Sequence, residues 1–259
     1  MFTPRKEDIN HKIQLLRLLR SILSDNILSN NLMFKGGTYA SLRGVLDRFS
    51  IDLDFDLPDE KAKNEIRDIL YKIFGDLGLV IKDESKNNLQ FFLKYDTGKE
   101  ERNTLKLEIN DKPSKFNEYE SVSLLELNMY CRGHALDTMF ANKLIAAKSR
   151  FDKTGKISGR DFYDIHTFFT QGLKINKKVV EDLSKTSYEK YIEILIKFIK
   201  DNVDTRLLNE DLNPLVDFKK LKIMLPHLKD EILLMLKSEI VKWFYFSRSL
   251  DHRKDVYRW

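Results

Sequence analysis

Two carboxylates in the first quarter of the chain have the type and spacing for metal chemistry. Asp52 and Asp54 lie in the run IDLDFDL at residues 51–57, whose strict alternation of apolar and acidic residues predicts a half-buried strand. Alternate side chains of a strand share a face, so we expect the two carboxylates to lie close together. Hard oxygen donors of this kind suit Mg²⁺ or Mn²⁺ and the transfer of phosphoryl or nucleotidyl groups.

A glycine turn precedes this strand and has the features of a phosphate-binding loop. Gly36 and Gly37 lack a Cβ, which lets backbone N–H groups approach phosphate oxygens, and a helix N-terminus after them adds positive potential. The Thr38 hydroxyl can donate to an anion, and Lys35 adds a positive charge. Alone, each pattern has a simpler interpretation, because a Gly-Gly pair is usually only a turn and a D-x-D strand is commonly a solvated edge.

A third carboxylate and several later residues extend the candidate set. The strand expected over residues 104–110 places Glu108 on its polar face, where it would complete a two-metal clamp. Lys143 and Arg150 share one face of an expected helix and can reach the same anion, although a salt-bridged surface stripe is the alternative.

Two acidic residues near the start of a later helix have two interpretations. Asp161 and Asp164 can stabilise the helix dipole, or they can act in catalysis. In the second case one of them orders Lys143 or a nucleotide hydroxyl, or accepts a proton from the attacking hydroxyl.

The hydrophobic patterns predict an α+β fold whose mixed sheet positions these residues. Residues 1–130 form a mixed α/β core with flanking helices, and residues 131–259 form a helical domain that completes the active site. Helices are expected over residues 9–28, 39–49, 61–74, 135–151, 161–169, 177–202 and 228–246, the last just after Pro226. Strands are expected over residues 51–57, 79–82, 89–95 and 104–110, with almost no strand beyond about Val122.

Composition restricts the class of protein and the kind of partner. The chain has 259 residues, 42% hydrophobic and 33% charged, so it can bury a core. A single cysteine excludes an internal disulfide and favours a reducing compartment such as the cytoplasm. No apolar run reaches the roughly 18 residues of a membrane span, so no membrane partner is expected. The formal net charge is −2 for residues 1–130 and +7 for residues 131–259, which fits a polyanionic partner, although solvated helix faces are the simpler interpretation.

The order of these motifs resembles the nucleotidyltransferase superfamily, in which a Gly-Gly-Ser/Thr turn precedes a D-x-D strand. The runs FKGGT at residues 34–38 and RFSIDLDF at residues 48–55 resemble the first two motifs of the AbiEii/AbiGii toxin family. These are nucleotidyltransferase-like toxins of type IV toxin–antitoxin and phage abortive-infection systems. The runs KLIAAKSR at residues 143–150 and RDFYDI at residues 160–165 match two later motifs in order.

The chain departs from the family pattern in two places. A polar segment at residues 151–159 separates Arg150 from Arg160 and is expected to form a loop over the site. The third acid is Glu108 rather than a certain Asp, so the metal clamp can rest on Asp52 and Asp54 alone.

The resemblance implies a metal-dependent nucleotidyltransferase that transfers NMP from an NTP to an acceptor hydroxyl and releases pyrophosphate. It implies catalytic roles for Asp52, Asp54, Lys143 and Asp161, nucleotide or phosphate binding by Lys35, Gly36, Gly37, Thr38, Ser50 and Arg150, metal binding by Asp52, Asp54 and Glu108, and supporting roles for Arg160 and Asp164. The implied partners are Mg²⁺ or Mn²⁺, an NTP, an RNA acceptor such as tRNA, and a cognate antitoxin. Two alternatives are a kinase-like phosphotransferase and a catalytically inactive nucleotide-binding or protein-interaction module.

Overall fold

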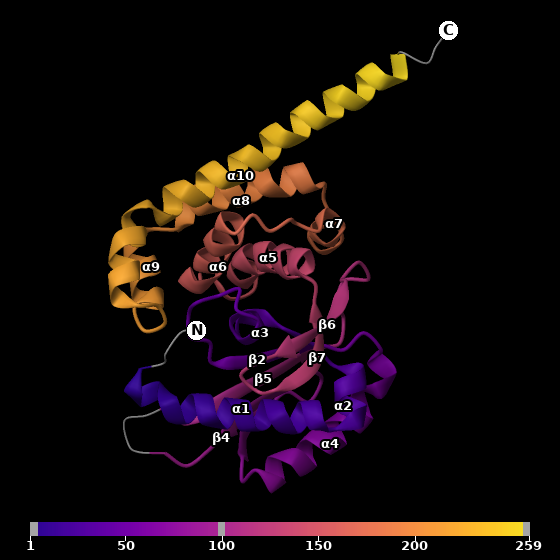
Figure 1. Cartoon of the computed structure of the whole chain (residues 1–259), viewed down its shortest axis with the longest axis vertical. Helices are drawn as coiled ribbons and strands as arrows, with labels where there is room; N and C mark the ends of the chain where they lie inside the picture. Colours follow the sequence, from indigo (N-terminus) through magenta and orange to yellow (C-terminus); the bar gives the residue numbers. More distant parts are fainter. Residues whose placement is uncertain (1–4, 98–101, 256–259) are drawn as a thin grey trace. The chain divides into compact units, whose positions relative to one another are not determined.

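The computed structural model describes residues 5–97 and 102–255, and the chain divides into two compact units, Met1–Met139 and Phe140–Trp259. The first unit contains a mixed sheet of seven strands with helices beside it, and the second is helical over its described residues (Figure 1). The expected α+β class is therefore confirmed.

The elements of the first unit alternate between helices and short strands. Its helices are η1 (Lys6–Asp8), α1 (Ile9–Ser24), α2 (Asn26–Asn31), α3 (Gly36–Leu42), η2 (Glu60–Ala62) and α4 (Lys63–Asp76). Its strands are β1 (Met33–Lys35), β2 (Asp52–Asp56), β3 (Val80–Glu84), β4 (Leu89–Lys94), β5 (Thr104–Asn110), β6 (Tyr119–Leu124) and β7 (Met129–His134).

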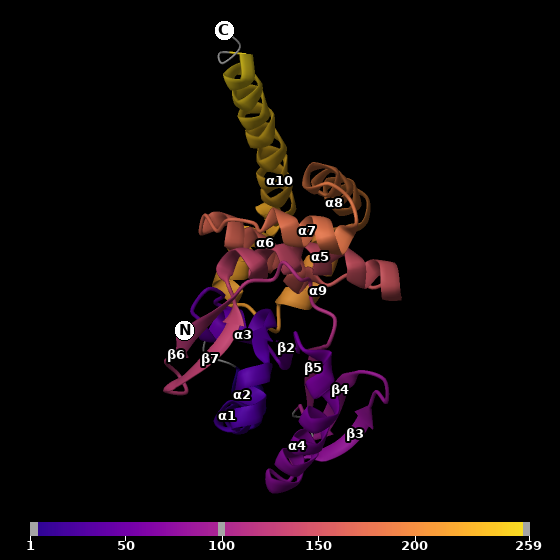
Figure 2. The same ribbon diagram turned by 90° about the vertical axis from the view of Figure 1, so that its right-hand side faces the viewer.

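The sheet has the order β3-β4-β5-β2-β1-β7-β6, with β3 and β6 at its edges (Figure 2). Strand β2 lies in the centre, parallel to β5 and antiparallel to β1, and β1 is in turn parallel to β7. The strand expected over residues 51–57 is confirmed as β2: Leu53 and Phe55 are buried on one face, and Phe55 stacks on Phe34 with ring centroids 4.8 Å apart. The alternate residues of β2, all acidic, therefore occupy the opposite face.

The prediction of almost no strand beyond Val122 is wrong, because β6 and β7 follow and complete the sheet. Strand β6 is an edge strand in which only Leu124 is buried, so it lacks a clear alternating pattern. Strand β7 contains Gly133, which is usually unfavourable in a strand. A Cβ on Gly133 would lie 2.7 Å from the Phe34 carbonyl oxygen, so the close approach of β7 to β1 requires glycine there.

The second unit is built from helices around a mainly aliphatic and aromatic core. They are α5 (Leu136–Thr154), which begins shortly before the unit boundary, α6 (Gly159–Thr170), α7 (Lys177–Ser184), α8 (Tyr188–Asn202), α9 (Thr205–Leu212) and α10 (Phe218–Asp255). Helix α10 packs on α6, α8 and α9. No helix in the described parts of the chain combines the length and the apolar character needed to cross a membrane.

Several helix boundaries differ from the sequence-based predictions for local reasons. The helix expected over residues 9–28 breaks at Asp25, whose carboxylate accepts hydrogen bonds from the N–H groups of Ile27 and Leu28 and caps α2. The helix expected over residues 177–202 breaks at Lys185, which is left-handed with φ 58°.

Two further boundaries are wrong in opposite directions. The helix expected over residues 39–49 begins earlier, at Gly36, and ends at Leu42. Helix α10 continues through Pro226, where the sequence predicts a helix only afterwards. Pro226 is exposed, while Leu221, Leu228 and Ile232 on the same helix are buried, so tertiary packing outweighs the hydrogen bond that proline removes.

Candidate active site

The glycine turn lies directly against the acidic face of β2. Gly36 follows β1 and has φ +80°, a left-handed conformation that favours glycine. A Cβ on Gly36 would lie 2.9 Å from the Asp54 Cβ and would overlap the Asp54 Oδ2 atom. Glycine is therefore required both for the backbone conformation and for the space, and the turn backbone is in contact with the Asp54 carboxylate.

The next two residues connect the turn to the start of β2. A Cβ on Gly37 would lie 2.8 Å from the Ser50 hydroxyl and 2.7 Å from a guanidinium nitrogen of Arg48. The Thr38 hydroxyl donates a 2.5 Å hydrogen bond to the backbone carbonyl of Asp52. The structure thus brings together the turn residues, Ser50 and the two carboxylates that the sequence predicts as one site.

Arg48 is part of this arrangement, although it is absent from the predicted site residues. Its side chain is buried and donates a 2.9 Å hydrogen bond to the Phe49 carbonyl. The position of Arg48 in the RFSIDLDF run was the available signal.

Strand register places Glu108 next to Asp54. Asp54 is the partner of Glu108 on β5 and of Lys35 on β1, so the three side chains form one row across the sheet. Glu108 is ion-paired with Lys106 and lies 3.5 Å from the Gln90 amide nitrogen. Burial opposes ionisation of Glu108, but the hydrogen bond and charge of Lys106, with Lys35, outweigh it and lower the Glu108 pKa.

Electrostatics distinguish Asp54 from its neighbours. Burial raises the pKa of Asp54 to about 6, the Asp52 carboxylate acts in the same direction, and the charge of Lys35 opposes both. A bound cation would favour the ionised form of Asp54, because its positive charge offsets the negative charges that meet at this position.

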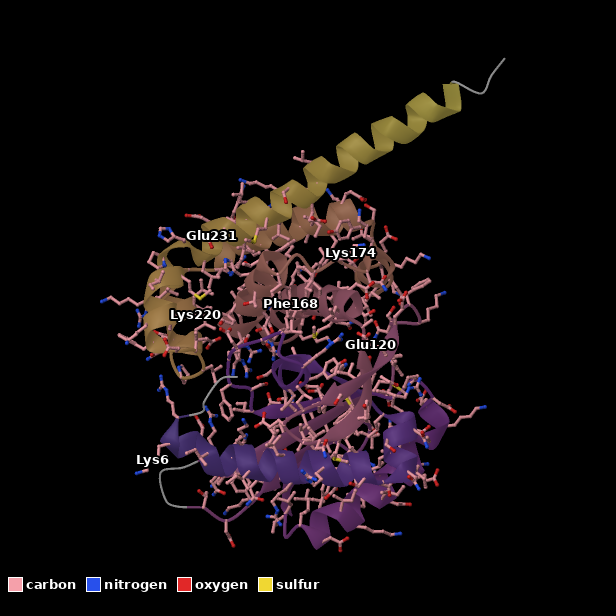
Figure 3. The ribbon with its side chains drawn as sticks, in the orientation of Figure 1. Lys6, Glu120, Phe168, Lys174, Lys220 and Glu231 are labelled. Carbon is pink, nitrogen blue, oxygen red and sulfur yellow. The ribbon has the colours of Figure 1, made fainter. Side chains whose placement is uncertain are left out.

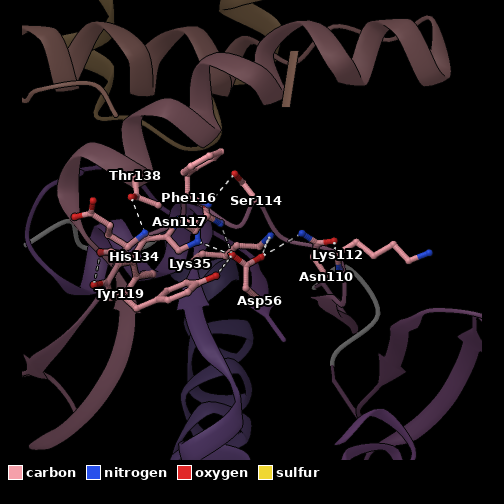
Figure 4. Close-up of polar contacts among 12 residues, drawn as sticks. Lys35, Asp56, Asn110, Lys112, Ser114, Phe116, Asn117, Tyr119, His134 and Thr138 are labelled. Atoms are coloured by element: carbon pink, nitrogen blue, oxygen red, sulfur yellow. Dashed lines mark hydrogen bonds and ion pairs between the residues drawn. The ribbon is translucent and has the colours of Figure 1, made fainter. Parts of the chain in front are cut away.

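Asp56, the third acid of β2, is the centre of a buried polar network (Figure 4). Its side chain is fully buried. The Lys35 ammonium lies 2.6 Å from Asp56 Oδ1, and the His134 Nε2 atom lies 2.7 Å from Oδ2. Asn117 and Tyr119 donate to the same Oδ2 at 2.9 and 3.1 Å, and Asn110 donates to Oδ1 at 3.3 Å.

This network leaves Asp56 ionised and fully engaged. Burial opposes the charge, but Lys35 and His134 outweigh it and lower the Asp56 pKa. Burial lowers the pKa of His134 against the influence of Asp56. Asp56 is therefore a structural carboxylate. The sequence places it on the acidic face but does not single it out, because its partners come from residues far away in the chain.

A second group of predicted residues lies in the second unit, around Lys143 of α5. The Lys143 ammonium lies 2.9 Å from both Asp161 Oδ1 and Asp164 Oδ2 on α6, and both acids are buried. Arg150 lies 3.5 Å from Asp161 Oδ2, an oxygen that is the one buried side-chain polar atom without a hydrogen-bond partner in the described residues. Lys143 and Arg150 are thus both ion-paired with the Asp161 carboxylate of the protein itself, and their binding of a substrate anion stays a prediction.

The remaining predicted residue, Arg160, lies at the start of α6. Its Nε is 3.5 Å from the Ser158 hydroxyl, and the preceding N–H of Gly159 donates to Asp211 at 2.6 Å. Tyr163 follows about one turn later on α6, and its buried hydroxyl accepts a 2.9 Å hydrogen bond from Lys220 of α10, which is labelled in Figure 3. The segment expected to be a loop over residues 151–159 is shorter in the structure, because α5 extends to Thr154 and α6 begins at Gly159, so that residues 155–158 connect the two helices.

The donor set of the first unit suits a divalent cation held jointly by protein and substrate. Among residues 5–97 and 102–255, no group of three or more His, Cys, Asp or Glu side chains forms a metal site by itself. Asp52 and Asp54 supply two carboxylates, and Mg²⁺ is commonly bound by one or two carboxylates together with substrate phosphates. The pair therefore fits such an ion.

Comparison with solved structures places this arrangement in a known fold. JHP933 from Helicobacter pylori has a TM-score of 0.58 and 22% identity, over 97% of this chain and 100% of that one. A putative nucleotidyltransferase from H. pylori has a TM-score of 0.58 and 21% identity, over 93% and 98%. MenT4, a nucleotidyltransferase toxin from Mycobacterium tuberculosis, has a TM-score of 0.54 and 17% identity, over 92% and 89%. The fold is therefore nucleotidyltransferase-like, as expected.

Sequence comparison gives the family. None of the curated proteins compared with the chain matches it. The family model described as nucleotidyl transferase AbiEii toxin, type IV toxin–antitoxin system, matches residues 17–232, which include both candidate groups of residues. This match confirms the resemblance found in the sequence motifs. The chain belongs to the AbiEii nucleotidyltransferase toxin family of type IV toxin–antitoxin systems.

Proposed function

We propose that this nucleotidyltransferase transfers NMP from an NTP to a hydroxyl of an RNA acceptor such as tRNA, in the cytoplasm, with Mg²⁺ or Mn²⁺ as cofactor. The observation that carries the proposal is the contact between the glycine turn and Asp54, with Asp52 on the same face of β2. A phosphate-binding backbone and a cation-binding carboxylate pair are thereby adjacent. Family membership supports the reaction class and implies an antitoxin partner.

The turn is proposed to bind the triphosphate. Gly36 and Gly37 carry no side chain of their own, and the Thr38 hydroxyl fixes the turn to the backbone of Asp52. Backbone N–H groups positioned in advance stabilise phosphate charge without reorganisation during the reaction. Ser50 lies beside Gly37 and is proposed to contribute a further hydroxyl.

The carboxylate pair is proposed to hold the metal, with Glu108 beside it as a third acid. A bound divalent cation would neutralise charge on the triphosphate and the leaving group. The acceptor hydroxyl loses its proton to a base and its oxygen forms a bond to the α-phosphorus, while the bond from that phosphorus to the bridging oxygen breaks and pyrophosphate leaves. Asp52 and Asp54 would hold this cation in place beside the phosphates, which the carboxylates alone would repel, and positioning of the reactants supplies most of the catalysis, as is general for phosphoryl transfer.

The second unit is proposed to contribute cationic residues and a surface for RNA. Lys143 is held by Asp161 and Asp164, and we propose that it and Arg150 bind anionic groups of the substrates. Asp161 also has an oxygen without a hydrogen bond, which makes it the better candidate of the two acids for a proton-accepting role. Residues 131–259 carry a net charge of +7, which favours association with a polyanion.

The proposal is tested by a transfer assay with the purified full chain, Mg²⁺, each α-³²P-labelled NTP in turn and total tRNA. Label on RNA that disappears with Asp54→Ala, together with pyrophosphate release, is the expected result. Asp76→Ala serves as the matched control, because Asp76 is an exposed carboxylate at the end of α4. Absence of label on RNA with every NTP would overturn the RNA acceptor, and release of nucleoside diphosphate would indicate a kinase instead.

A further inference from the structure

Lys35 lies beside two carboxylates on the acidic face of the sheet. Register makes Asp54 its direct partner across β1 and β2. Its ion pair, however, is with Asp56, one position further along that face of β2, at 2.6 Å. The ammonium is thus paired with the carboxylate next to the one that the proposed cation site uses.

The network around Asp56 favours the pairing of Lys35 with Asp56. His134, Asn117 and Tyr119 converge on Oδ2, and Lys35 approaches Oδ1 (Figure 4). Because three groups from outside β2 hold one oxygen, the carboxylate cannot rotate freely, and the other oxygen stays directed at Lys35.

The second lysine near Asp54 has the same kind of partner. Lys106 lies on β5, opposite Asp52, and its ammonium is ion-paired with Glu108. Each of the two lysines that act on Asp54 is therefore neutralised by a different acid.

We propose that Asp56 is a positioning residue that holds the Lys35 ammonium away from Asp54 and so keeps the Asp54 carboxylate available to a divalent cation. An ammonium and a cation compete for the same carboxylate oxygens, and a direct ammonium contact would weaken cation binding. Lys35 thereby acts as the counter-ion of Asp56 and not as a phosphate ligand. The inference rests on the proposed function, since it concerns the proposed metal site of Asp52 and Asp54.

The test measures Mn²⁺ binding to the full chain by electron paramagnetic resonance, with no nucleotide present. Asp56→Asn keeps the size of the side chain but removes its charge, so Lys35 turns to Asp54 and Mn²⁺ binds roughly tenfold more weakly. The double variant Lys35→Met/Asp56→Asn removes the competitor and restores wild-type affinity. It also removes both charges of a buried pair, which is commonly tolerated in folding.

Two controls separate positioning from general stability and from long-range charge. Tyr119→Phe removes a neutral donor from the same Asp56 oxygen, so it lowers the melting temperature while Mn²⁺ affinity stays within roughly twofold of wild type. A crystal structure of Asp56→Asn shows the Lys35 Nζ within hydrogen-bonding distance of Asp54. A Lys35 that remains away from Asp54 would mean that any loss of affinity comes from charge at a distance, and would overturn the proposal.

The outcomes separate the inference from the function on which it rests. If wild-type protein binds no Mn²⁺, the metal site and the inference fall together. If the wild type binds Mn²⁺ and Asp56→Asn binds it equally well, only the inference fails. If Asp56→Asn does not fold, the double variant Lys35→Met/Asp56→Asn is the test. If the double variant binds Mn²⁺ more weakly than the wild type, the proposed role of Asp56 in keeping Lys35 away from Asp54 is wrong.

Discussion

Gly36 and Asp54 are in such close contact that no side chain fits between them. The Cβ that an alanine would add at Gly36 would lie 2.9 Å from the Asp54 Cβ. The turn after β1 and the acidic face of β2 are therefore held at a separation that only a glycine permits. This contact fixes the phosphate-binding candidate relative to the cation-binding candidate.

Gly36→Ala is expected to abolish nucleotidyl transfer. The new methyl group collides with the Asp54 carboxylate, and a non-glycine residue at φ +80° costs about 1–2 kcal/mol in addition. The change is measured by incorporation of α-labelled NTP and by thermal unfolding. Gly44→Ala is the matched control, since Gly44 has φ +79° with no atom within 4 Å of the added Cβ. It should lose stability and keep activity; equal losses of activity in the two variants would exclude the collision as the cause.

Thr38→Val is expected to reduce activity more than stability. Valine keeps the shape of threonine but loses the hydrogen bond to the Asp52 carbonyl, worth about 1 kcal/mol in folding. The loss frees the turn from the strand that carries the carboxylates, so kcat should fall. Steady-state kinetics measures this, and Thr38→Ser, which retains the hydroxyl, should remain near wild type. A serine variant as impaired as the valine variant would show that the methyl group matters instead.

Asp54→Asn is expected to stabilise the metal-free protein above pH 6. The pKa of Asp54 in the folded chain is about 6, against about 3.9 for an unfolded aspartate. A raised pKa favours the protonated folded state, so this contribution is fully present below about pH 3.9 and is lost as pH rises through the folded value. Urea unfolding with EDTA across pH 4 to 8 should show an advantage for the variant at neutral pH that shrinks on acidification. A constant difference at every pH would contradict the shift.

Lys143→Met is expected to destabilise the second unit by roughly 3–5 kcal/mol, because two buried carboxylates lose their shared counter-ion. Urea unfolding of the full chain measures the loss. Lys148→Met, which breaks an exposed ion pair with Asp152 one turn away on α5, should cost less than about 1 kcal/mol. Adding Asp164→Asn to Lys143→Met should recover part of the stability; no recovery would mean that repulsion between the acids is not the cause.

The sequence was sufficient to predict the central part of the candidate site. Strict alternation in residues 51–57 placed Asp52 and Asp54 on one face, and alternation in residues 104–110 placed Glu108 on the polar face of β5. Both predictions depend only on the two-residue repeat of a strand, which is a local property. The register that sets Glu108 opposite Asp54 is not local, and the sequence left it open.

The features that the sequence did not predict depend on contacts between distant segments. Asp56 is of the same residue type as Asp52 and Asp54, the other two acids of β2. Its polar partners come from distant segments: Lys35 lies on β1, Asn117 precedes β6 and His134 lies on β7. Strand β7 gave no signal because Gly133 is chosen for its close approach to Phe34 and not for strand propensity.

The pairing of β1 with β7 also sets the order of events during synthesis. Phe34 pairs with Gly133, so β1 cannot gain its second neighbour until a segment about 100 residues further on has emerged from the ribosome. Until His134 emerges, the fully buried Asp56 lacks one of its partners. A nascent chain that ends before this point already contains the glycine turn and the carboxylates of β2, but it lacks β7, the second neighbour of β1 in the sheet. Synthesis itself thus delays the appearance of a working toxin until more than half of the chain has been made.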